Sequence, residues 1–78
     1  MELGTGKTTI LGGRLRKARR QKRWTRPDLN KATGIPVNTL RQYEEGRCLP
    51  SAPRLILLAK ALDVDPAWLV PVEKEDEK

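Results

Sequence analysis

Two amides and a guanidinium, from Asn38, Gln42 and Arg41, stand at helical spacing within a short segment of the sequence. Residues three and four apart lie on the same face of a helix, so these groups would point in one direction. Asn and Gln form paired hydrogen bonds with adenine, Arg forms them with guanine, and a small apolar side chain contacts the thymine methyl group. The outward face predicted for this helix comprises Val37, Asn38, Arg41, Gln42 and Glu45. The chemistry of this face is that of a surface able to read the base edges of duplex DNA.

Two short helices joined by a tight turn are predicted to position this surface. Thr25 can accept a backbone N–H as the N-cap of the first helix, which ends just before Gly34, a residue suited to the left-handed conformation. Pro36 opens the second helix, which continues over residues 36–45 and is closed by Gly46. The positions expected to be buried there are Ile35, Leu40 and Tyr43. A helix of two turns does not persist alone, so the rest of the domain must hold the pair.

Three further helices complete the predicted organisation. One starts after Gly12 and Gly13 and runs to about Arg23; another is capped by Ser51, and a short last helix follows Asp65. The apolar face predicted for the helix after Ser51 comprises Leu55, Leu58, Ala59 and Leu62, widened by Ile56 and Leu57. With short connections and no strand pattern, the sequence predicts an all-α fold, a compact five-helix bundle.

The chain divides into three predicted parts. Residues 1–10 are expected to form a flexible arm, residues 11–70 the folded domain, and residues 71–78 a charged, mainly acidic tail. Within the arm, Gly4 to Thr9 reads GTGKTT, like the end of a phosphate-binding loop. The first glycine of the full motif would fall at Met1, so nucleotide binding is disfavoured.

The basic residues are concentrated in the first part of the chain. The net charge is +6, but residues 1–47 carry twelve Lys/Arg against four Asp/Glu, whereas residues 48–78 carry four against six. Arg14 to Arg26 contains eight basic residues and no acidic one. Such a block either coats a solvated helix or follows a polyanion, and its one-sided distribution favours the second. Membrane binding needs a strong apolar face opposite the charges, which this block lacks, so no membrane partner is expected.

Composition argues against most catalytic chemistry. The 78 residues include no His and a single cysteine, Cys48, so an intrachain disulfide is impossible and a His/Cys metal site has too few ligands. A chain this short leaves little interior for a catalytic cleft. We therefore expect no enzyme, no cofactor and no visible effector pocket. The lone thiol and the absence of a signal-like apolar segment suit a cytoplasmic protein.

An ordered set of residues carries a family resemblance. Its pieces are Leu15-Arg16-x-x-Arg19, Thr25-x-x-x-Leu29, Gly34-Ile35-x-x-x-x-Leu40-x-x-Tyr43-Glu44-x-Gly46, Pro50-Ser51, Leu55, Leu58-Ala59-x-Ala61-Leu62 and Trp68-Leu69. With these spacings, residues 11–70 resemble the Xre/Cro-type, lambda-repressor-like helix-turn-helix family of phage repressors and bacterial regulators. The resemblance implies a nucleoid-associated transcriptional repressor, bound as a homodimer to double-stranded DNA at a near-palindromic operator with residues 36–45 in the major groove.

The resemblance also assigns roles by position. The base-reading positions are Val37, Asn38 and Gln42, with Arg41 on the same face, where it reaches either a base edge or a phosphate. The phosphate-binding positions are Arg26, Thr39 and Arg47. Arg19 and Glu44 match a structural charge pair that ties the first helix to the end of the recognition helix. We expect Glu44→Ala to destabilise the fold more than it alters sequence preference, because the substitution leaves the partly buried Arg19 without its counter-charge.

Three residues depart from the family pattern. Asn30 replaces a usual Ala that faces the recognition helix, so its amide must find a partner or tilt the helices. Pro36 replaces a Ser or Thr N-cap, which removes one phosphate-binding hydroxyl. Trp24 replaces a smaller aliphatic residue and is expected to fill the core rather than to stack on bases.

A protein-binding role is the main alternative. Antitoxins and bridging cofactors use the same fold, and fold does not dictate function. Trp68, Leu69 and Val70 could form an apolar patch for a dimer or another partner, or Trp68 could plug the end of the bundle. Weak, salt-insensitive DNA affinity would favour the protein-binding role.

Overall fold

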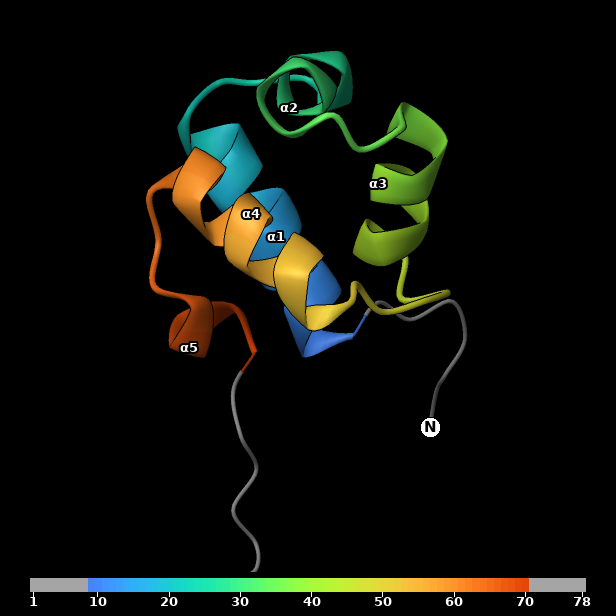
Figure 1. Ribbon diagram of the computed structural model, residues 1–78, viewed down its shortest axis with the longest axis vertical. Helices are drawn as coiled ribbons and strands as arrows, with labels where there is room; N and C mark the ends of the chain where they lie inside the picture. The colour runs from blue at the N-terminus through green and yellow to red at the C-terminus, as the bar shows by residue number, and fades with distance from the viewer. Residues whose placement is uncertain (1–8, 71–78) are drawn as a thin grey trace, which may run out of the picture.

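The computed structural model describes residues 9–70, which form five α-helices without a strand. The helices are α1 (Ile10–Gln21), α2 (Arg26–Thr33), α3 (Val37–Glu44), α4 (Ala52–Leu62) and α5 (Pro66–Leu69). In Figure 1, α2 lies at the top of the molecule, α3 stands at one side, and α5 lies at the opposite lower corner. α1 packs on α3 and α5, α2 packs on α3 and α4, and α4 packs on α5. The predicted all-α, five-helix bundle is confirmed.

Short polar side chains determine where the helices begin. Thr25, Ser51 and Asp65 cap α2, α4 and α5 through side-chain acceptors for backbone N–H groups. Thr9 does the same for α1, with its Oγ1 2.9 Å from the backbone nitrogen of Gly12. The prediction that the first helix starts after Gly12 and Gly13 was therefore wrong, since both glycines lie inside α1.

Gly12 allows α1 to lie directly against the end of α3. A Cβ atom at this position would lie 2.6 Å from the backbone oxygen of Glu44 and 2.7 Å from that of Tyr43. Contacts that short are repulsive, so only a residue without a side chain fits. The reason for this glycine is tertiary packing, which local sequence rules read as a helix boundary.

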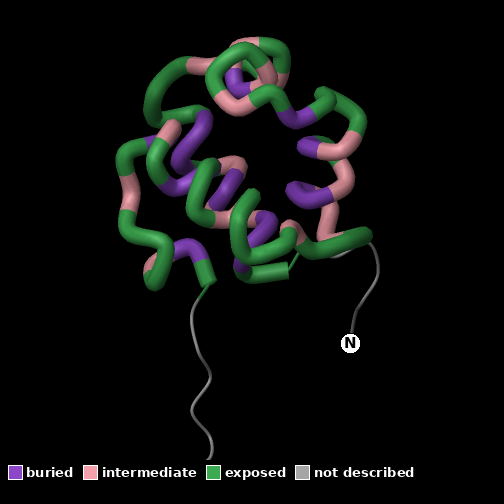
Figure 2. The backbone as a smooth tube through the Cα atoms, viewed as in Figure 1, coloured by how far each residue is buried: buried purple, intermediate pink, exposed green. Residues whose placement is uncertain are grey.

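The core lies where the inner faces of the helices meet (Figure 2). Its buried apolar side chains are Leu11, Leu15, Ala18, Leu29, Ile35, Leu40, Tyr43, Leu58, Ala59, Leu62 and Leu69. The prediction that Ile56 and Leu57 widen the buried face of α4 was wrong, because these side chains are 52% and 39% exposed. Both lie on the side of α4 turned away from the core.

Among residues 9–70, no helix has the length and apolar character that a crossing of the bilayer requires.

The close contact at Gly12 yields a stability prediction. Replacing glycine with alanine inside an exposed helix normally adds about 1 kcal/mol of stability. Gly12→Ala should instead lower the free energy of unfolding by about 2 kcal/mol, because its Cβ must displace the α3 backbone. Urea denaturation followed by circular dichroism measures the change.

Gly34→Ala provides a comparison at the α2–α3 turn, where the added Cβ meets nothing within 4 Å and only the positive φ is strained. We expect this variant to lose less stability than Gly12→Ala. Equal or greater stability of Gly12→Ala than wild type would contradict the proposed packing.

Candidate nucleic-acid interface

The start of α2 is fixed by a reciprocal cap. The Thr25 side chain accepts the backbone N–H of Asp28, and the Asp28 carboxylate accepts the backbone N–H of Thr25. The hydrogen bond from the backbone N–H of Thr25 to the Asp28 carboxylate is the main cause that lowers the pKa of Asp28. Because the pKa of Asp28 is lowered in the folded state, folding favours the charged carboxylate. The cap therefore stabilises the fold at neutral pH, and this contribution is lost as the pH falls through the folded-state pKa of Asp28.

The turn between α2 and α3 depends on a left-handed glycine. Gly34 has a φ of 80°, and its N–H donates to the carbonyl of Asn30. The Asn30 side-chain amide donates to the carbonyl oxygen of Ile35 at 2.7 Å. The amide of Asn30 therefore has the hydrogen-bond partner that an amide at this position needs. This hydrogen bond links α2 to the segment just before α3.

The inner side of α3 orients the helix. Leu40 is fully buried, and Tyr43 is buried with its hydroxyl 3.1 Å from Nη1 of Arg54. Pro36 precedes the helix without a side-chain capping bond, as expected from its replacement of Ser or Thr. The first turn of α3 therefore leaves backbone N–H groups without a side-chain cap, and these are groups that bind anions at helix N-termini.

The outward side of α3 carries the four predicted base-reading side chains. Val37, Asn38 and Arg41 are exposed, and Gln42 is half-buried. Arg41 donates from Nη2 to Oδ1 of Asn38 at 2.8 Å, so these two side chains hold one another on the helix surface. One lone pair of Oδ1 and the amide N–H groups of Asn38 remain available for an adenine edge.

Gln42 has a neighbour that the sequence did not indicate. The thiol of Cys48, in the loop after α3, lies 3.7 Å from Oε1 of Gln42 and donates to it. The contact spans the bend between α3 and the following loop, so it places Cys48 at the edge of the reading face. Sequence spacing alone shows no sign of this approach, because it depends on how the loop turns after Gly46.

A buried carboxylate joins three elements behind this face. Glu44 is fully buried, and Arg19 of α1 contacts it through two nitrogens, Nε at 2.7 Å and Nη2 at 3.1 Å. Arg26 of α2 places its Nε 3.1 Å from Oε1 of Glu44, and Arg16 of α1 places its Nε 3.7 Å from the same oxygen. The predicted contact between Arg19 and Glu44 is present, and Arg16 and Arg26 extend it into a cluster around one carboxylate.

The predicted phosphate-binding residues lie around α3 in different settings. Arg26 is half-buried at the start of α2, and its Nε is engaged with Glu44 while other guanidinium N–H groups remain. Thr39 is half-buried on α3. Arg47 is exposed in the loop after α3, where its Nε contacts Oε1 of Glu45 at 3.0 Å. The three residues thus come from the start of α2, from α3 itself and from the loop that follows it.

The two tryptophans serve packing. Trp24 is half-buried against the core, with the Lys22 ammonium 5.2 Å from the centre of its ring. Trp68 is half-buried, the Arg14 guanidinium lies 5.1 Å from its ring centre, and Arg14 also donates to its carbonyl oxygen. Leu69 is fully buried, so the C-terminal apolar patch considered from the sequence does not form as a unit.

A short supporting helix, a left-handed glycine and a second helix with a polar outward face define a helix-turn-helix protein. A model of the Helix-turn-helix domain family matches residues 10–69. The chain belongs to this family.

Three known proteins are similar to this chain. The HTH-type transcriptional regulator YazB of Bacillus subtilis is 38% identical over 65 residues, which cover 83% of this chain and 94% of that protein. The restriction-modification controller protein C.AhdI from Aeromonas hydrophila superimposes with a TM-score of 0.73 and 30% identity, covering 77% of this chain and 91% of its own. The P22 c2 repressor, solved in complex with a synthetic operator, has a TM-score of 0.77 and 28% identity, covering 82% and 97%. These findings confirm the predicted Xre/Cro-type, lambda-repressor-like fold.

The cluster around Glu44 yields a prediction that separates stability from recognition. Glu44→Gln keeps the shape but removes the negative charge that Arg16, Arg19 and Arg26 share. We expect the free energy of unfolding to fall by about 3 kcal/mol, because the buried Arg19 and the half-buried Arg16 and Arg26 are left without their counter-charge. Thermal and urea denaturation measure the loss.

Glu45→Gln is the matched control, since Glu45 lies next in the chain but is half-exposed and paired only with the exposed Arg47 among the described residues. Its stability should change by less than about 1 kcal/mol. A Glu44→Gln variant as stable as Glu45→Gln would show that the cluster does not hold the helices together.

Proposed function

We propose that this protein is a DNA-binding transcription regulator that places α3 in the major groove of a double-stranded operator. The observation that carries the proposal is the outward face of α3, where Val37, Asn38, Arg41 and Gln42 stand opposite the buried Leu40 and Tyr43. Membership of the helix-turn-helix family and likeness to the operator-bound P22 c2 repressor support it. The same family and fold are those of DNA-binding regulators and give no support to an enzyme.

Each side chain on this face suits a particular contact. Asn38 and Gln42 can pair with adenine, and Val37 can contact a thymine methyl group. Arg41 is held beside Asn38 by the hydrogen bond between them, so it either reads an adjoining guanine or contacts a phosphate. Because the pair is linked, a change at one side chain alters the position of the other.

Contacts to the DNA backbone would set the register of α3. Arg47 is exposed in the loop beyond the end of α3. Thr39 is half-buried on α3 itself. Arg26 would contribute from the start of α2 while it remains attached to Glu44. Phosphate contacts of this kind supply affinity that depends on salt but carry little sequence information.

The outer face of α4 is the surface through which we expect a homodimer to form on a near-palindromic operator. Pro53, Ile56 and Leu57 are exposed and spaced three and four residues apart, so they form an apolar face outside the core. We define these three residues as the α4 face. A second copy packed there would bury apolar surface and place two recognition helices on one duplex. Such a dimer acts most simply as a cytoplasmic repressor that occludes a promoter.

The alternative of a protein-interaction module also draws on the α4 face, because exposed apolar residues suit a different partner as well. The two functions differ in the response to salt. A DNA-binding regulator loses affinity steeply as salt rises, whereas a protein-binding module would bind duplex DNA weakly and with little dependence on salt.

Selection of bound duplexes from a random library tests the DNA-binding proposal. We expect a palindromic consensus whose half-sites are separated by about one helical turn. Gln42→Ala and Asn38→Ala should change the bases tolerated at particular positions, by about 1–3 kcal/mol of discrimination each. Equal losses on every sequence from Gln42→Ala would contradict the assignment of α3 as the reading helix.

Arg47→Ala serves as the contrasting variant. It should weaken binding to all sequences alike and reduce the slope of log affinity against log salt by about one. Arg26→Ala should do the same and also lower stability, because Arg26 contacts Glu44. Denaturation curves separate the two effects.

Ile56→Asp tests the dimer. A charge on the α4 face should weaken binding to the full palindrome by roughly tenfold or more, about 1.4 kcal/mol, through lost cooperativity. Affinity for a single half-site should remain unchanged, because Ile56 lies outside the α3 surface. Analytical ultracentrifugation of the protein–operator complex measures the stoichiometry, and a variant that still binds as a dimer would exclude this face.

A further inference from the structure

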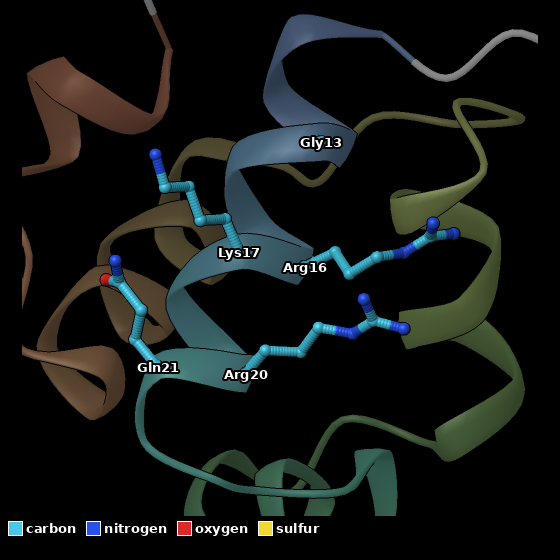
Figure 3. Close-up of a pocket in the computed structure, with 5 residues that line it drawn as sticks. All are labelled: Gly13, Arg16, Lys17, Arg20 and Gln21. Atoms are coloured by element: carbon cyan, nitrogen blue, oxygen red, sulfur yellow. The ribbon is translucent and has the colours of Figure 1, made fainter.

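A basic hollow lies along the solvent face of α1. It has a volume of about 410 Å³ and is lined by Gly13, Arg16, Lys17, Arg20 and Gln21. These positions recur at the three- and four-residue spacing of one helical stripe, which we call the α1 stripe. Gly13 has no side chain, and the side chains of Arg16 and Lys17 extend on opposite sides of the helix (Figure 3).

The α1 stripe carries more positive charge than nearby carboxylates can neutralise. Arg16 lies 3.7 Å from Glu44, which is already contacted by Arg19 and Arg26. Lys17 and Arg20 are exposed, and neither forms an ion pair within residues 9–70. Three cations on one stripe repel one another, and a bound polyanion would relieve that repulsion.

The stripe continues into the surface proposed to bind DNA phosphates. Arg16 and Arg20 both extend from α1 toward α3, whereas Lys17 and Gln21 extend along the other side of the helix (Figure 3). The Nε atoms of Arg16 and Arg26 approach the same oxygen of Glu44, at 3.7 and 3.1 Å. The α1 stripe and the start of α2 therefore meet at one point.

The spacing of the stripe suits a nucleic-acid backbone. Residues four apart on a helix lie about 6 Å apart along its axis, and one strand of duplex DNA carries a phosphate about every 3.4 Å of its axis. Arg16 and Arg20 can thus reach separate phosphates of one strand. Long, flexible, exposed cations serve such contacts without base selectivity.

We infer that the α1 stripe is a second backbone-binding surface, which follows the phosphates that flank the base pairs read by α3. The inference rests on the proposed function, since the same duplex occupies both surfaces. Lys17 and Arg20 then contribute affinity and salt dependence but no sequence preference. The duplex bound by the protein extends beyond the bases that its recognition helix contacts.

The test compares Arg20→Gln and the Lys17→Gln/Arg20→Gln double variant with wild type. One probe is a duplex trimmed to the selected consensus, and the other carries one additional helical turn on each side. Wild type should bind the longer probe more tightly, and the double variant should bind both alike. Each lost phosphate contact should reduce the salt slope by about 0.9, which makes the gain in affinity on a tenfold dilution of salt about eightfold smaller.

Lys60→Gln is the charge-matched control, because Lys60 is also exposed but lies on α4 outside the stripe. It should leave the preference for the longer probe intact.

If Arg20→Gln and Lys60→Gln behave alike while the protein still selects a consensus, the inference is wrong and the proposed function stands. If the double variant loses affinity for single-stranded RNA and keeps its affinity for duplex DNA, the stripe serves another polyanion. If wild type selects no consensus and binds no duplex, the proposed function fails, and the inference fails with it.

Discussion

The carboxylate of Glu44 is the point on which the arrangement of the first three helices depends. It is fully buried at the end of α3, and arginines from α1 and α2 reach it. A buried ion is costly unless its hydrogen bonds are satisfied, so the helices stay where the arginines can meet it. Gly12 lies against the backbone oxygen of the same residue, so packing and charge fix α1 and α3 at one place. The direction of the α3 outer face follows from this junction.

The junction explains how an eight-residue helix can hold its outer face in a fixed orientation. α3 is too short to be stable alone, and its first turn has no side-chain cap. At that end Gly34 and the Asn30 amide hold the chain, and at the other end Glu44 anchors it. Between these two anchors Leu40 and Tyr43 are buried, so the helix has little freedom to rotate about its axis. Base readout needs this constraint, because bidentate hydrogen bonds tolerate little displacement.

Local signals predicted the supporting motif, and tertiary contacts escaped prediction. Thr25, Gly34 and Ser51 each act through backbone groups within a few residues, so their capping and turn roles could be predicted from sequence. Gly12 acts through a contact with α3, more than thirty residues away, so local sequence rules wrongly predict a helix boundary there. In α4, Leu55 to Leu58 are four consecutive apolar residues, and periodicity alone could not show that Ile56 and Leu57 face away from the core. The outward placement of the α3 residues followed from helical spacing, but the contacts of Gln42 with Cys48 and of Arg26 with Glu44 did not.

The basic block contains two kinds of charge that the sequence cannot separate. Arg14 and Arg19 are engaged with Trp68 and Glu44, so part of the positive charge holds helices together. Lys17 and Arg20 are exposed on the same helix and form no ion pair among residues 9–70. The contacts of the buried Arg19 and the half-buried Arg14 are screened little by salt, whereas the exposed charges are screened within about 10 Å at 0.1 M salt. Under the proposed function, a regulator built in this way would keep α3 in place while its affinity for the DNA backbone varied with ionic strength, so sequence preference and overall affinity could change independently.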